Sequence, residues 1–88
     1  MINKTFKGTI GVDIGGSTWT CVVWPESKDI LGTGKATKVT ATVDGHPVQT
    51  ALMPNGHGAH MLPLSKPVLK AINKQLGDQV TIMIIDRL

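Results

Sequence analysis

The sequence predicts a mainly β fold: a small closed or nearly closed β-barrel of about five or six strands, with one α-helix near the C-terminus. Several short segments alternate apolar and polar residues, which is the pattern of strands that bury one face. Residues typical of tight turns separate these segments. Because closure removes exposed sheet edges, a barrel is the favoured arrangement for a chain of 88 residues.

The expected strands follow one another with short connections. They lie at residues 5–12, 19–24, 38–43, 47–53, 60–64 and 79–86. Gly15-Gly16 forms the first turn, and Asp44-Gly45 is a pair that tolerates the positive φ of a hairpin turn. Pro25 ends the second strand because proline has no backbone N–H to donate. The last segment is apolar on both faces, so we expect it to lie centrally in the sheet.

One helix is predicted over residues 66–76. Ser65 is suited to cap it, Pro67 lies in its first turn, and Gly77 fits its end. Its apolar stripe is expected to bury Leu69 and Ile72 against the barrel. A short helical turn is also expected over residues 25–31.

Composition indicates a single globular domain over residues 1–88, with 41% hydrophobic and 17% charged residues. Cys21 is the only cysteine, which excludes an intrachain disulfide and favours a reducing compartment. The N-terminal segment lacks the apolar stretch of a signal peptide, and the longest apolar run, residues 82–85, is far shorter than the ~20 residues that span a bilayer. We therefore expect a cytoplasmic protein that is not in the membrane.

Two polar loops, residues 44–46 and 55–60, are the predicted contact surface, because polar loops on a rigid barrel commonly carry binding. The candidate ligand-binding residues are Asp44, His46, Asn55, His57, His60 and Trp24. No acid and base are evidently paired along the sequence. The leading hypothesis is therefore a non-enzymatic binding module for an unknown small molecule or protein, with no catalytic residue, metal ligand or cofactor assigned.

The histidines leave an enzymatic alternative open. His46, His57 and His60 could serve a small metal-assisted hydrolase, and the His57-x-x-His60 spacing could chelate a metal if the loop curled. A zinc site needs three or four ligands, and no further ligand is evident. Loop imidazoles bonded to backbone or water are the favoured interpretation.

The segment Ile10–Thr18 is similar to the first phosphate-binding hairpin of sugar kinases and actin-like ATPases. Those enzymes close two large lobes over the nucleotide, and this chain is too short for one lobe, so a plain turn is favoured. Trp19 and Trp24 are five positions apart in the sequence, and in a regular strand this odd spacing predicts opposite faces and one partly exposed ring. Packing is favoured over a ligand platform for both.

From residue 19 onward the sequence resembles the family of bacterial and archaeal domains of unknown function DUF1905. The motifs that carry the resemblance are Trp24-Pro25-Glu26-Ser27, Gly32-Thr33, Lys38-Val39, Asp44-Gly45-His46-Pro47, Gly56-His57-Gly58-Ala59-His60-Met61-Leu62-Pro63 and Gly77-Asp78-Gln79-Val80. The ordered series is more specific than any one motif. It implies the small barrel and no particular activity.

A nucleic-acid partner is the remaining alternative. Residues 62–80 are similar to the strand, helix and Gly-Asp-strand unit of AbrB-type transcription factors, which bind DNA as intertwined dimers. The pI is about 9.3, and Lys66, Lys70 and Lys74 would align on one face of the predicted helix. The only arginine is Arg87, so specific base recognition is not expected.

Overall fold

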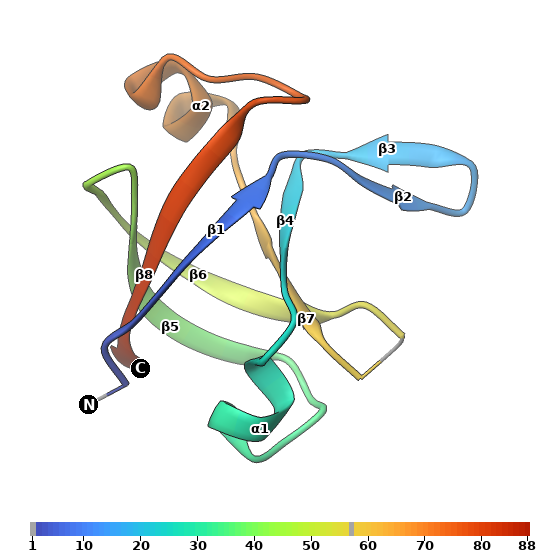
Figure 1. The fold of residues 1–88 in the computed structure, drawn as a ribbon, viewed down its shortest axis with the longest axis vertical. Helices are drawn as coiled ribbons and strands as arrows, with labels where there is room; N and C mark the ends of the chain where they lie inside the picture. The colour runs from blue at the N-terminus through green and yellow to red at the C-terminus, as the bar shows by residue number, and fades with distance from the viewer. Residues whose placement is uncertain (1, 57) are drawn as a thin grey trace.

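The computed structural model describes residues 2–56 and 58–88 and contains two short helices among its strands (Figure 1). The strands are β1 (Lys4–Thr9), β2 (Val12–Ile14), β3 (Ser17–Trp19), β4 (Cys21–Trp24), β5 (Thr37–Val43), β6 (His46–Pro54), β7 (His60–Pro63) and β8 (Gln79–Arg87). The helices are α1 (Ser27–Leu31) and α2 (Lys66–Ile72). The predicted helical turn over residues 25–31 is confirmed by α1.

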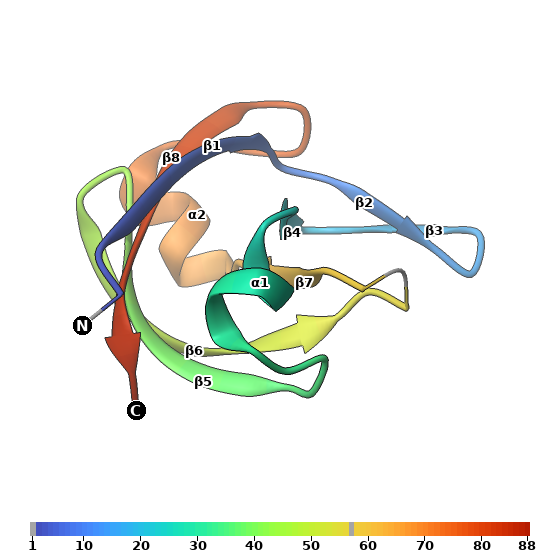
Figure 2. The same ribbon diagram turned by 60° about the horizontal axis from the view of Figure 1, so that its bottom comes forward.

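Six strands form one antiparallel sheet in the order β1-β8-β5-β6-β7-β4. The sheet curls until its end strands, β1 and β4, contact each other, which makes a nearly closed barrel (Figures 1 and 2). The predicted mainly β, nearly closed barrel is confirmed. The last strand, β8, lies between β1 and β5, in the internal position expected from its two apolar faces.

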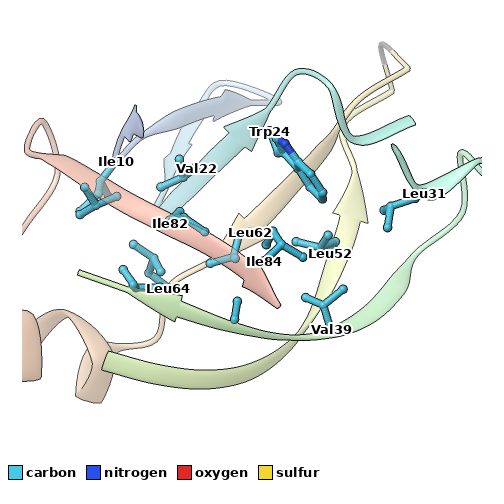
Figure 3. Close-up of a cluster of buried hydrophobic side chains, with 13 residues drawn as sticks. Ile10, Val22, Trp24, Leu31, Val39, Leu52, Leu62, Leu64, Ile82 and Ile84 are labelled. Atoms are coloured by element: carbon cyan, nitrogen blue, oxygen red, sulfur yellow. The ribbon is translucent and has the colours of Figure 1, made fainter. Parts of the chain in front are cut away.

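The core fills the barrel with the inward-facing side chains of these strands (Figure 3). Val39, Ala41 and Val43 of β5 are fully buried, as the alternation of that segment predicts. The turn after them confirms the Asp44-Gly45 hairpin, since both residues have positive φ, 50° and 83°. This burial pattern specifies the register of β5, because a shift of one residue would turn the apolar face of the strand outward.

The contact between β1 and β4 closes the barrel without a ladder of backbone hydrogen bonds in the described residues. A Cβ atom on Gly8 would lie 2.4 Å from Cγ1 of Val22, so glycine permits this close approach. Beside it, the rings of Phe6 and Trp24 stack with centroids 5.5 Å apart and planes inclined by 2°. We call these four residues the seam.

Beyond the seam the same two chain segments continue as the β2–β3 hairpin, which projects away from the barrel (Figure 2). The chain bends out of β1 at Gly11, where φ is 137° and the N–H donates to the carbonyl of Cys21 at 2.9 Å. The expectation of continuous strands over residues 5–12 and 19–24 is thereby corrected. Each is divided into a barrel part and a hairpin part.

Helix α2 ends at Ile72, four residues before the predicted end. Asn73 adopts the left-handed conformation, with φ of 57°, and its N–H bonds to the carbonyl of Lys70 at 3.2 Å. Leu69 and Ile72 are half-buried and pack against the core, whereas Leu76 lies beyond the helix and is 48% exposed. In the described part of the chain, neither helix is long and apolar enough to cross a membrane.

Substitution of Gly8 by alanine should test the seam. We expect Gly8→Ala to lower the free energy of unfolding by about 1–3 kcal/mol, because the new methyl group meets the stiff, fully buried side chain of Val22. Urea denaturation followed by the fluorescence of the buried Trp24 would measure it.

The matched control is Gly34→Ala. Gly34 has no positive φ, and nothing lies within 4 Å of the position that a Cβ atom would occupy there. This variant should be neutral or stabilised by up to about 1 kcal/mol. Equal effects of the two substitutions would mean that the seam does not require a glycine.

Candidate functional site

The two predicted contact loops lie at opposite ends of β6. His46 begins this strand opposite Val43, and Pro54 ends it opposite His60 of β7. Since β6 has 9 residues, roughly 25 Å of strand separates the loops. The described residues of the two expected contact loops, 44–46 and 55–60, therefore lie apart along β6. His57 lies outside the described residues.

Asp44 is committed to the turn between β5 and β6. Its Oδ1 accepts the N–H of Thr81 at 2.8 Å, while its own N–H donates to the carbonyl of Thr81 at 2.8 Å. Lys74 Nζ lies 3.5 Å from Oδ2. These contacts attach the turn to β8, so Asp44 acts in the fold rather than as a free ligand.

Asn55 closes the loop between β6 and β7. Its Oδ1 accepts the N–H of Ala59 at 3.3 Å, and its own N–H donates to the carbonyl of Ala59 at 3.0 Å. Such a side-chain contact with the backbone is what makes asparagine frequent in turns. The predicted ligand residue thus holds the shape of its own loop.

His60 is fully buried at the start of β7, against the fully buried Ser27 of α1. The Ser27 hydroxyl oxygen accepts the backbone N–H of His60 at 2.7 Å and lies 2.7 Å from its Nδ1. The other ring nitrogen, Nε2, lies 2.8 Å from the carbonyl oxygen of Lys35. The three contacts are compatible with one another when Nε2–H donates to the carbonyl of Lys35 and the serine O–H donates to Nδ1.

Ser27 and His60 are the residue types of a Ser-His catalytic pair, but their surroundings differ from those of such a pair. The third partner is a backbone carbonyl instead of a carboxylate, and neither Ser27 nor His60 reaches the surface. The pair instead joins α1, β7 and the segment before β5. It links the Pro25-Glu26-Ser27 and His60-x-Leu62-Pro63 segments through Ser27 and His60.

Trp24 and His60, two of the candidate ligand residues, are both buried. Trp24 is 1% exposed within the core (Figure 3). Cys21, at the start of the same strand, is also buried, and this burial raises the pKa of its thiol. Within residues 2–56 and 58–88, no three His, Cys, Asp or Glu side chains lie together as metal ligands would.

The predicted lysine row is broken by the early end of α2. Lys66 and Lys70 are exposed on the helix, but Lys74 follows it. Lys74 Nζ donates to the carbonyl of Gln79 at 2.8 Å and faces Asp44. The three side chains therefore do not form a helical stripe, and this correction removes the spacing argument for phosphate contacts.

The β2–β3 hairpin is an exposed feature that the sequence patterns did not mark as a site. All three residues of β3 are exposed, and Trp19 leaves 54% of its surface uncovered. Thr18 donates to Asp13 Oδ1 across the hairpin at 2.9 Å. The odd spacing of Trp19 and Trp24 did predict one exposed ring, but nothing in the alternation marked the bend that lifts β3 off the barrel.

The Ser27–His60 contact gives a stability prediction. Ser27→Ala leaves the buried backbone N–H and Nδ1 of His60 without their hydroxyl partner, so we expect a loss of about 2–3 kcal/mol in the free energy of unfolding. Ser65→Ala is the control, since Ser65 is exposed and makes no side-chain capping bond to α2. It should change stability by less than about 0.5 kcal/mol. Urea denaturation of both variants would decide, and a Ser27→Ala protein as stable as the control would contradict the assigned contact.

Comparison with known proteins gives a family match. No curated protein matches the chain. A family described as a domain of unknown function, DUF1905, matches residues 6–84. That span begins at Phe6 of the seam and ends at Ile84 in β8, so it takes in the hairpin and nearly the whole barrel. The chain belongs to the DUF1905 family.

Proposed function

We propose that this domain is a non-enzymatic binding module for a protein partner, and that the β2–β3 hairpin is its contact element. The observation that carries the proposal is the 54% exposed Trp19 on a hairpin that stands outside the barrel. Tryptophan is the residue type most enriched among the side chains that dominate protein interfaces. Covering a large aromatic ring removes more apolar surface from water than covering any other side chain.

The surroundings of Trp19 support a contact with protein. Val12 lies opposite it in the hairpin register and is half-buried, while Ser17 and Thr18 are small and polar. An apolar centre with a polar margin is the usual composition of a protein interface. The Thr18–Asp13 hydrogen bond and the ladder of β2 with β3 fix the arm, so that binding would order few additional groups.

The rest of the chain supports a binding role over chemistry. The hydroxyl of Ser27 and the imidazole of His60 are of the types used in acid-base catalysis, and both are engaged inside the fold. Asp44 and Asn55 hold turns at the two ends of β6. The hairpin, by contrast, stands outside the barrel and exposes the ring of Trp19.

Native mass spectrometry of the protein purified from its own host tests the proposal. Wild-type protein should carry another protein chain or, when concentrated to about 1 mM, a second copy of itself. Trp19→Ser should lose that chain, because the exposed ring supplies most of the apolar contact.

The matched control is Met53→Ser, which removes a 47% exposed apolar side chain from β6, outside the hairpin. It should keep the bound chain. If folded Trp19→Ser protein retains its partner as well as the control does, or if wild-type protein is recovered as the free chain and also stays monomeric at about 1 mM, the hairpin is not the contact element.

A further inference from the structure

We propose that the hairpin pairs with a second copy of this chain, β3 against β3 in antiparallel orientation, about a two-fold axis at Thr18. The inference rests on the proposed function and names the partner of the same hairpin. It follows from the chemistry of the free edge, the order of side-chain sizes along β3 and the position of the one charge in the hairpin.

The outer edge of β3 is open and carries no charge. The hairpin is a two-stranded sheet, so β3 has β2 on one side and no strand of the described chain on the other. Edge strands that stay unpaired are usually protected by lysine, proline or another charged residue. Ser17, Thr18 and Trp19 provide none of these, and all three are exposed.

Antiparallel pairing centred on Thr18 fits side chains of complementary size. Thr18 faces Thr18 of the second copy, which is a favourable cross-strand pair. Trp19 of each copy then faces Ser17 of the other on one side of the sheet, so each large ring lies beside a small side chain. The two indoles occupy diagonal positions within reach of each other, which joins the apolar centres of both hairpins.

The only charge in residues 12–19 selects β3 over β2 as the pairing edge. Asp13 is the central residue of β2, so pairing β2 with its own copy would set two carboxylates directly opposite each other. Pairing through β3 keeps Asp13 one strand away, where it accepts the hydroxyl of Thr18 within its own hairpin. The arrangement is isologous and closes at two copies, which avoids open-ended assembly.

A contact of this size is weak. It involves strands of 3 residues and two indole rings, so the surface area that it buries is well below the roughly 1,200 Å² that stable interfaces bury. A dissociation constant of about 0.1 mM is therefore expected for the isolated chain. At this affinity, the fraction of chains in the dimer depends on the local concentration of the chain.

Sedimentation equilibrium of the purified chain, from about 10 µM to about 1 mM, tests the pairing. Wild-type protein should reach a dimer in that range and form nothing larger. Thr18→Lys should raise the dissociation constant at least about tenfold, because two ammonium groups would meet at the two-fold axis. Each lysine can still pair with Asp13 within its own hairpin, so the variant should fold. Met53→Lys adds the same charge outside the hairpin and should dimerise like wild type.

A mixing experiment tests the register. Thr18→Glu, made together with Asp13→Asn so that no carboxylate lies opposite the new one, should also be monomeric alone. Mixed with Thr18→Lys it should form a heterodimer, because opposite charges then meet at the axis.

A wild-type chain that stays monomeric at about 1 mM, or a dimer that is indifferent to Thr18→Lys, would overturn the pairing. The binding proposal is judged separately. If the pure chain is monomeric but host-purified protein carries a different protein through Trp19, self-pairing fails and the proposed function stands.

Discussion

The barrel depends on the contact between β1 and β4, where no ladder of hydrogen bonds joins two neighbouring strands in the described chain. Every other junction in the six-stranded sheet has a paired register. At the seam, closure depends on how closely side chains of β1 and β4 pack. Gly8 admits the side chain of Val22, and Phe6 lies flat against Trp24. Close packing of this kind is sensitive to one added carbon atom, so the seam is the most demanding part of the fold.

The seam also determines what the molecule presents to its surroundings. β1 and β4 meet through side chains at the barrel and diverge from it beyond Gly11, so their continuation pairs separately as β2 and β3. A rigid closed body thereby carries a short arm with an exposed tryptophan (Figure 2). Inside the barrel, the buried Ser27 and His60 bind each other and hold α1 to the barrel wall. In the proposed function, the barrel supports the hairpin and the hairpin makes the contact with a partner.

Much of the barrel could be predicted from the sequence, because burial alternates along β5 and β8 and the Asp44-Gly45 turn has a clear chemical signature. The candidate site could not. Asp44 and His60 are polar residues in loop-like sequence, and whether such residues face solvent depends on partners far away in the chain, at Thr81 and at Ser27. The end of α2 was misplaced for a related reason: Leu76 continues the apolar stripe, but the left-handed turn after the helix sends it elsewhere.

The measurement that tests the central claim most directly is a double-mutant cycle between Gly8 and Val22, with free energies of unfolding from urea denaturation. Val22→Ala alone should destabilise by removing a fully buried side chain. In the double variant the new methyl group of Gly8→Ala occupies the space that Cγ1 vacates, since the two positions are 2.4 Å apart. If this contact closes the barrel, the double variant should be more stable than the sum of the single effects by at least about 1 kcal/mol. Additive effects, within about 0.5 kcal/mol, would contradict closure of the barrel through this contact.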